Sequence, residues 1–240
     1  NAKHRAQWLS TLNAYEFPYI GDTSIAKVDG PAVREILVKI WLEKPETARR
    51  VRQRIVTVIE WAVAQGYREA TIPMAPINRS LPKAKVKTRH HSALPYPDIA
   101  EFLAKLRDRQ TVGRLALEFA ILTATRSGEV RGAKWPEINV DSATWTIPAE
   151  RMKAGREHIV PLSASAVVLL STARQFRQTG SDLVFPGTKH NSALSDMTLT
   201  KVCRDIGVDA VPHGFRSTFR DWVSEATDFD GEVAEMALAH

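Results

Sequence analysis

A basic segment without apolar periodicity divides this chain of 240 residues. Residues 81–92 offer neither the 3.6-residue repeat of a helix nor the alternation of a strand. Their basic members alternate with small residues and are Lys83, Lys85, Lys87 and Arg89. The pattern indicates a linker, and its positive charges could follow a DNA backbone between two lobes. We therefore predict two domains: residues 1–92, which include the linker, and residues 93–240.

The net charge of +6 is concentrated in the first domain. Residues 1–92 hold 16 Lys and Arg against 8 Asp and Glu, whereas residues 93–240 hold 17 against 19. Such asymmetry suggests a polyanion-binding lobe joined to a less charged partner. Charge alone leaves a second interpretation open, a basic surface that is merely solvated.

The first domain is predicted to be all-helical. Apolar side chains recur at helical spacing within residues 31–41, and Pro45 marks the start of a longer helix that Gly66 ends. The apolar stripe of this longer helix is Ala48, Val51, Ile55, Ile59 and Ala62. Four arginines are predicted to lie off the stripe and to face DNA phosphates: Arg49, Arg50, Arg52 and Arg54. A solvated helix would show the same pattern.

The second domain is predicted to be mostly helical with a small antiparallel sheet, so the fold class is mainly α. Two short strands are expected over residues 143–148 and 157–162, joined by a turn at 151–156. The expected helices cover residues 97–106, 112–122, 164–176, 197–206, 214–226 and 232–238.

Several kinds of site have no motif in the sequence. There is no phosphate-binding GxxxxGK[ST], no GxGxxG after a strand, no HExxH and no paired CxxC, so we expect neither a metal nor a nucleotide cofactor. Cys203 is the single cysteine, and no apolar stretch approaches ~20 residues, so the cytosol is the simplest compartment. Because the chain begins at Asn1 and stops at His240 directly after an apolar run, we expect a fragment.

Cationic and imidazole side chains stand at positions that favour chemistry on a phosphate. Arg126 separates two helices, Lys153 lies in the hairpin turn, His213 and Arg216 share the start of one helix, and His240 follows another. Arginines can bind the non-bridging oxygens of a phosphodiester as charge builds up there, and histidines can donate to them or move a proton. Any one of these residues alone could be a surface arginine, a solvated turn lysine or a capping histidine without a catalytic role.

Four motifs resemble the tyrosine recombinase family, and more closely the P4-like integrases of phages and genomic islands. They are Ala124-Thr-Arg-Ser-Gly-Glu129, Ile147-Pro-Ala-Glu-Arg-Met-Lys153 with His158-Ile-Val-Pro-Leu162, His213-Gly-Phe-Arg216, and Leu238-Ala-His240. The similarity extends to Lys44-Pro-Glu-Thr-Ala-Arg-Arg50 and Leu94-Pro-Tyr96, so it covers nearly the whole chain. The resemblance implies a helical core-binding domain followed by a catalytic domain of the DNA breaking–rejoining fold.

The resemblance also assigns roles to individual residues. Arg126 and Arg216 would be the two transition-state arginines, and Lys153 would be the general acid in the hairpin. The two histidine positions would be His213 and His240. Glu129 would hold Arg126 in position without itself contacting the phosphate.

The family's nucleophile is a tyrosine about ten residues beyond the position of His240, a reach of only ~15 Å in a helix. The tyrosines of this chain are Tyr15, Tyr19, Tyr67 and Tyr96, and none matches. We therefore expect the chain to stop before its nucleophile, and an N-terminal domain for arm-type DNA sites also looks absent.

The resemblance implies a site-specific recombinase that cleaves and rejoins DNA at attachment sites through a 3′-phosphotyrosine, without metal or cofactor. A homotetramer on DNA and accessory DNA-bending proteins are the expected partners. Two rivals stay open, a type IB topoisomerase that reseals the same strand and a DNA-binding regulator without chemistry. Strand exchange between two sites would exclude the topoisomerase, and cationic residues that matter only for affinity would favour the regulator.

Overall fold

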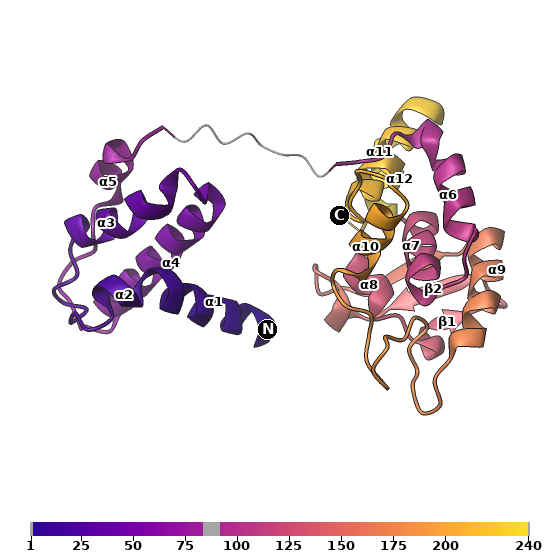
Figure 1. Ribbon diagram of the computed structural model, residues 1–240, viewed down its shortest axis with the longest axis horizontal. Coiled ribbons are helices and arrows are strands. Elements are labelled where there is room, and N and C mark those ends of the chain that lie inside the picture. The colour runs from indigo at the N-terminus through magenta and orange to yellow at the C-terminus, as the bar shows by residue number, and fades with distance from the viewer. Residues whose placement is uncertain (1, 84–91, 240) are drawn as a thin grey trace. The chain divides into compact units, whose positions relative to one another are not determined.

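A computed structural model of the chain describes residues 2–83 and 92–239, apart from the side chains of residues 2–4. The chain divides into two compact units, residues 1–88 and 89–240 (Figure 1). The predicted domain boundary between residues 92 and 93 lies a few residues from this division.

Within the described residues of the first unit, all regular secondary structure is helical. Its elements are α1 (Ala2–Tyr15), α2 (Phe17–Ile20), α3 (Gly30–Trp41), α4 (Pro45–Ala64) and α5 (Met74–Ser80). Asp29 caps α3, because its side chain accepts a hydrogen bond from the backbone nitrogen of Ala32 at 2.9 Å. Gly66 follows the end of α4 with φ +75°, a left-handed conformation that glycine adopts without strain. The predicted start and end of this helix are thus confirmed.

The core of the first unit lies between α3 and α4. Both apolar stripes predicted from the sequence are buried there, including Val33, Leu37, Ala48 and Val51, none of which is exposed to solvent. Each fully buried aliphatic side chain stabilises the fold by about 1.5–3 kcal/mol. Helix packing of this kind leaves the opposite face of α4 available for a partner.

The placement of Arg54 off the apolar stripe of α4 is wrong. Position 54 follows the buried Val51 by three residues and so shares its face, and Arg54 is only 5% exposed. Its Nη1 donates to the carbonyl oxygen of Gln7 at 3.0 Å, and its guanidinium lies 5.3 Å from the ring of Trp8. Arg54 therefore ties α1 to α4 and does not face outward toward phosphate.

A buried carboxyl makes the stability of the first unit depend on pH. Glu16 is 4% exposed, and burial raises its pKa to about 7 although Arg54 attracts the charged form. A raised carboxyl pKa favours folding in the protonated form, so stability is lost as pH rises from about 4.5 to 7. We predict that Glu16→Gln removes this loss and is the more stable protein at pH 8, by at most about 3 kcal/mol.

Denaturant unfolding of the first unit at pH 5 and pH 8 measures the effect. The exposed Glu60 supplies the control, since Glu60→Gln should not change the pH dependence. An equal pH dependence in Glu16→Gln and the parent would contradict the prediction.

The second unit is mostly helical with one small sheet, as predicted. Its α-helices are α6 (Ile99–Arg107), α7 (Val112–Thr123), α8 (Ser127–Arg131), α9 (Ala164–Ala173), α10 (Thr198–Asp205), α11 (Gly214–Ala226) and α12 (Gly231–Ala237). Its strands are β1 (Ile138–Asn139), β2 (Thr144–Ile147) and β3 (His158–Pro161). Short 3-10 turns η1 (Tyr96–Asp98), η2 (Trp135–Glu137), η3 (Ala149–Arg151) and η4 (Arg174–Phe176) connect them.

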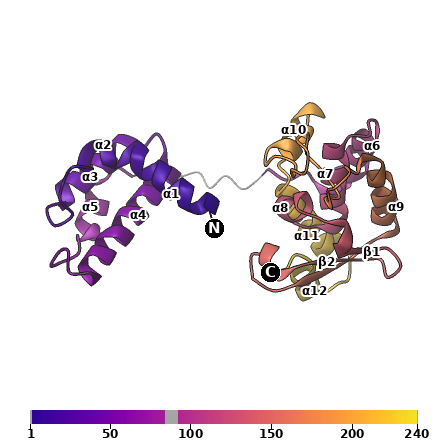
Figure 2. The ribbon, with the colours of Figure 1, turned by 90° about the horizontal axis from the view of Figure 1, so that it is seen from below.

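Helix α7 forms the centre of the second unit. Figures 1 and 2 show it inside the unit with α6, α8, α9 and α10 around it, and these helices contact it. Phe119 of α7 lies 5.2 Å from the ring of Trp145 on β2 and 5.5 Å from that of Phe185. This aromatic contact joins the central helix to the sheet.

The sheet is antiparallel in the order β1-β2-β3. Trp145 and Ile147 alternate with half-buried threonines along β2 and point into the core. The last pair of the β2–β3 ladder is Ile147 with His158. The whole segment between these two residues lies outside the ladder, and it carries Lys153.

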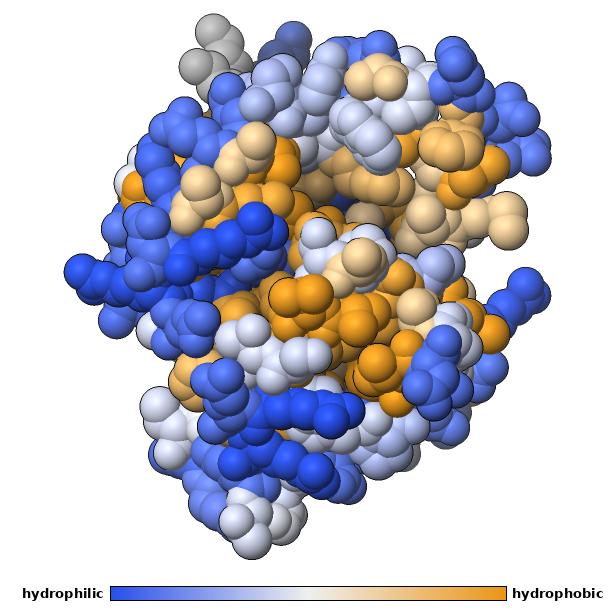
Figure 3. All heavy atoms as spheres, turned by 90° about the vertical axis from the view of Figure 1, so that its right-hand side faces the viewer, coloured by the Kyte–Doolittle hydropathy of each residue, from blue (hydrophilic) through white to orange (hydrophobic). Residues whose placement is uncertain are grey.

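The surface of the second unit also exposes apolar side chains. Figure 3, which looks at the side on which α6 and α9 lie in Figure 1, shows an apolar area bordered by hydrophilic side chains. Val168 of α9 is 66% exposed, and Met236 of α12 is 72% exposed.

No helix in the described part of the chain is both long and apolar enough to cross a bilayer.

Candidate active site

Arg126 occupies a sharp break between α7 and α8. Helix α7 ends at Thr123, and Ala124 adopts a left-handed φ of +51°, which turns the backbone out of the helix. Arg126 then stands directly before the first residue of α8. The break directs the side chain of Arg126 away from the core, and it is 22% exposed.

Glu129 holds Arg126 at two points. One carboxylate oxygen accepts from the backbone nitrogen of Arg126 at 2.8 Å, and the other accepts from its Nη1 at 2.9 Å. The Glu129 side chain is only 4% exposed. A charge-assisted pair shielded from water fixes the direction of the guanidinium and leaves its remaining N–H groups for other acceptors.

Arg216 lies on the first turn of α11 and is 5% exposed. It donates from Nη1 to the carbonyl oxygen of Ala124 and from Nη2 to that of Leu238, both at 2.6 Å. Burial, and then repulsion by Arg126, lowers the pKa of Arg216 to about 10, whereas Glu129 and Glu235 oppose this change. Arg216 therefore stays charged at neutral pH, although burying its charge costs free energy.

The end of α12 lies against both guanidinium groups. The carbonyl oxygen of Ala239 accepts from Nη2 of Arg126 at 3.3 Å, and that of Leu238 accepts from Arg216. Three segments that are far apart in sequence thus meet at the two arginines. His240 comes next in the chain but lies outside the described residues, so its predicted position beside the arginines stays a prediction.

The other two predicted residues lie at the surface. Lys153 is exposed in the connection between β2 and β3, where the Gly155 nitrogen donates to the Met152 carbonyl oxygen at 3.1 Å to close the turn. His213 is exposed immediately before α11, three residues from Arg216. The segment of Lys153 is linked to the Arg126–Glu129 pair through Arg151, whose Nη1 donates to the carbonyl oxygen of Glu129 at 3.2 Å.

Comparison with known proteins settles the family. Residues 1–78 match the phage integrase central domain, and residues 94–240 match the phage integrase family. The chain belongs to the phage integrase family.

The family resemblance drawn from the four motifs is thereby confirmed, and relatives of the P4-like type are among the matches. The integrase of Enterobacteria phage P4 is 32% identical over 99% of this chain, and the prophage integrase IntZ of Escherichia coli is 35% identical over 96%. The chain spans 58% and 57% of the length of these two relatives.

The fold of this integrase-family chain is also found in solved structures. A lambda integrase fragment, solved as a dimer bound to a core site, superposes with a TM-score of 0.75 at 19% identity, over 100% of this chain and 85% of that one. The Tn1549 transposon integrase in complex with circular intermediate DNA gives a TM-score of 0.73 at 11% identity, over 100% and 86%. At such identities the comparison establishes the fold, and the fold class predicted from the sequence is confirmed.

The basic side chains predicted to contact DNA in the first unit have different surroundings. Arg49 and Arg50 are exposed on α4, and Nε of Arg50 pairs with Glu46 at 3.2 Å. Arg52 is half-buried and donates to Oδ1 of Asn78 at 2.8 Å, which reduces its reach. Lys83 is exposed. Three further predicted contacts lie outside the described residues: Lys85, Lys87 and Arg89.

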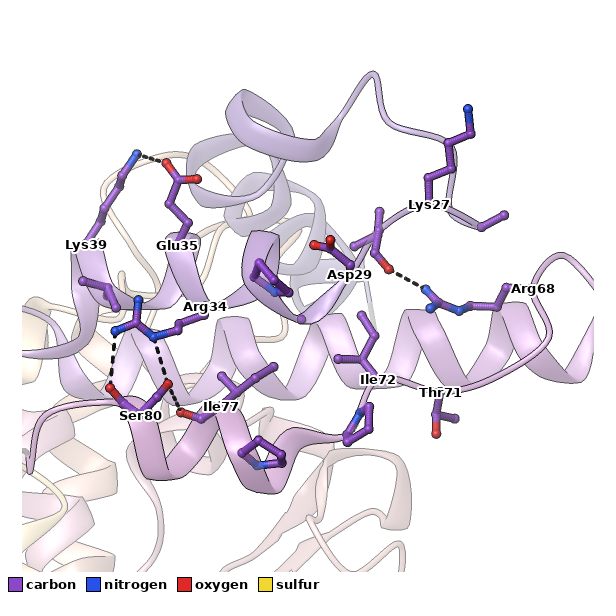
Figure 4. A pocket seen from close by; sticks show the side chains of 17 residues that line it. Lys27, Asp29, Arg34, Glu35, Lys39, Arg68, Thr71, Ile72, Ile77 and Ser80 are labelled. Atoms are coloured by element: carbon purple, nitrogen blue, oxygen red, sulfur yellow. Dashed lines mark hydrogen bonds and ion pairs between the residues drawn. The ribbon is translucent and has the colours of Figure 1, made fainter.

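A pocket of the first unit, which no sequence motif marks, contains four basic side chains, Lys27, Arg34, Lys39 and Arg68 (Figure 4). Arg34 donates to Ser80, and Nη1 of Arg68 donates to the carbonyl oxygens of Ile25 and Val28, each at 3.0 Å. Lys39 pairs with Glu35 at 3.2 Å. Because internal acceptors engage three of its four cations, the pocket is not assigned to phosphate.

Proposed function

We propose that this chain is the DNA-binding and catalytic core of a site-specific recombinase that integrates or excises a mobile element. One observation supports the proposal: Arg126 and Arg216, which come from two separate motifs, donate to the neighbouring carbonyl oxygens of Ala239 and Leu238 at the end of α12. A pair of like charges in a partly buried site is stabilised when an anion binds between them. The oxygens of a scissile phosphate supply such an anion.

The proposed role of the arginines is to bind the non-bridging oxygens of that phosphate. Charge on these oxygens grows in the transition state, so donors fixed in advance stabilise it more than they stabilise the bound substrate. Glu129 fixes Arg126, and the carbonyls of Ala124 and Leu238 fix Arg216. We assign His213 and His240 to donation toward the same oxygens or to proton transfer.

The proposed nucleophile is a tyrosine beyond His240. Its Oη attacks phosphorus and gives its proton to one of the two imidazoles, and the bond from phosphorus to the 5′ oxygen breaks. The ammonium of Lys153 gives that oxygen a proton. A 3′-phosphotyrosine and a free 5′-hydroxyl result, and the 5′-hydroxyl of a second duplex reverses the step.

Double-stranded DNA at attachment sites is the proposed partner, bound by both domains, residues 1–92 and 93–240. Four protomers on two duplexes in the bacterial cytoplasm, with accessory DNA-bending proteins, complete the proposed assembly. The solved relatives include a lambda integrase tetramer bound to a Holliday junction, and exposed apolar side chains such as Phe229 and Met236 suit contact between protomers.

Strand exchange tests the proposed function directly. Two duplexes that span the boundaries of the genetic element carrying the gene are incubated with the full-length protein. The proposal expects recombinant products without added metal or nucleotide. Relaxation of supercoiled DNA without any exchange would instead identify a topoisomerase.

We predict that phosphate contacts of α4 contribute to the salt dependence of binding. Arg49→Ala and Arg50→Ala should each make the slope of log affinity against log salt shallower by roughly one unit, because each removes one counterion-releasing contact. Gln53→Ala is the matched control, since Gln53 is exposed on the same helix and carries no charge. Unchanged slopes in both arginine variants would show that this face of α4 does not contact DNA.

A further inference from the structure

The segment that carries Lys153 has few backbone bonds to the rest of the sheet. The β2–β3 ladder ends at the pair Ile147 and His158, and the turn between them is closed by local bonds such as that from the Arg151 nitrogen to the Pro148 carbonyl oxygen at 3.0 Å. Local bonds shape a turn but do not fix where it sits. The buried Met152 anchors the segment in the core, but a single apolar contact does not set the direction of the exposed turn of Lys153 relative to the arginines.

The side chain of Arg151 reaches from this segment to two other elements. Its Nη1 donates to the backbone carbonyl oxygen of Glu129 on α8 at 3.2 Å, and its Nη2 pairs with the carboxylate of Glu137 on η2. The same oxygen of Glu137 accepts from Nε1 of Trp145 at 3.1 Å and from the backbone nitrogen of Lys134 at 3.2 Å. Arg151 is therefore held by acceptors that are themselves fixed.

Glu129 connects the two halves of the candidate active site. Its carboxylate holds Arg126, and its backbone oxygen holds Arg151, two residues before Lys153. The guanidinium that binds phosphate and the turn that carries the acid thus take their positions from one residue of α8.

We propose that Arg151 is a positioning residue that sets the turn bearing Lys153 against the Arg126–Glu129 pair through its bonds to Glu129 and Glu137. The inference rests on the proposed function. A misplacement of about 1 Å between reacting groups can slow a reaction about 10²-fold, so a mobile turn would be a poor place for a general acid.

Stability alone does not explain an arginine at this position. The neighbouring Met152 is 7% exposed and already anchors the segment in the core. The Arg151 side chain is 22% exposed, and its Nε is buried without an acceptor among the described residues. Burying a cation with an unpaired N–H group costs free energy. The planar guanidinium donates in two fixed directions, however, and so fixes the orientation of the turn in a way that an apolar side chain cannot.

The packing of Gly132 offers a way to move this guanidinium without changing any charge. A Cβ at position 132 would lie 2.6 Å from Nη1 of Arg151, so Gly132→Ala displaces the end of a flexible side chain from its bond to Glu129. Arg151→Gln removes the ion pair itself. Arg156→Gln is the control, because Arg156 is exposed in the same turn.

Cleavage by the full-length protein is measured on a normal substrate and on one with sulfur in place of the bridging 5′ oxygen. Arg151→Gln and Gly132→Ala should slow normal cleavage about 10- to 100-fold without loss of DNA affinity. Both should recover on the sulfur substrate, because a thiolate leaves without a proton from Lys153. Arg156→Gln should match the parent on both substrates.

Equal losses on both substrates, or parent-like cleavage by Arg151→Gln, would overturn the inference while leaving the proposed function intact. Failure of the unmodified protein to cleave would overturn the proposed function. Amide hydrogen exchange on the chain itself separates the two, since Arg151→Gln and Gly132→Ala should speed exchange in residues 152–157 and Arg156→Gln should not. Unchanged exchange in the first two variants would overturn the positioning contact whatever the activity.

Discussion

Arg126→Ala slows DNA cleavage by the full-length protein about 10²-fold or more and leaves its affinity for duplex DNA almost unchanged. In the proposed mechanism, Arg126 is fixed in advance by Glu129 and binds oxygens whose negative charge grows in the transition state. Single-turnover cleavage and equilibrium binding, measured on the same duplex, give the two quantities.

Arg131, the last residue of α8, provides a matched control for Arg126, which directly precedes this helix. It also forms an ion pair, with Asp196 at 2.5 Å, and its side chain is 20% exposed against 22% for Arg126. Arg131→Ala should cost similar stability and leave the cleavage rate near that of the parent. If Arg126→Ala lowers binding and cleavage equally, Arg126 only docks DNA.

Lys153→Ala cleaves the normal substrate very slowly and the substrate with a bridging 5′ sulfur at close to the parent rate. An alkoxide is a poor leaving group that needs a proton as the bond breaks, whereas a thiolate leaves without one. The rate ratio between the two substrates, measured in single turnover, reports on proton donation alone.

Two further variants serve as controls for this rate ratio. Arg126→Ala should gain no rescue from sulfur, because its role concerns the non-bridging oxygens. Arg156→Ala tests the rival cation of the same turn and should cleave both substrates normally. Rescue of Arg156→Ala instead of Lys153→Ala would move the general acid to residue 156.

The helices that pack most strongly are those that the sequence predicts best. Val33, Leu37, Val51 and Ile59 repeat at helical spacing because one face of each helix is buried. Helix α1 has no apolar stripe that would predict it, because Leu9 is exposed, and Arg54 holds this helix through a backbone oxygen. Such a contact has no signal in residue type or spacing.

In the candidate site, too, some residues can be predicted from sequence motifs and others cannot. Arg126 and Arg216 could be found from their motifs, and Glu129 from its position three residues after Arg126. The acceptors that orient Arg216 are backbone carbonyls at residues 124 and 238, which any sequence supplies. The contact between Arg151 and Glu137 joins residues that are neighbours only after the sheet has folded.

The linkage between protein and cleaved DNA tests the central claim most directly. The full-length protein is incubated with a nicked duplex from the boundary of its genetic element, labelled on one strand at either the 5′ or the 3′ end. Denaturing electrophoresis then separates covalent complexes. The account predicts that the 5′-labelled fragment migrates with the protein, joined through a 3′-phosphotyrosine that lies beyond His240. A complex that carries the 3′-labelled fragment, or cleavage without any covalent complex, would contradict it.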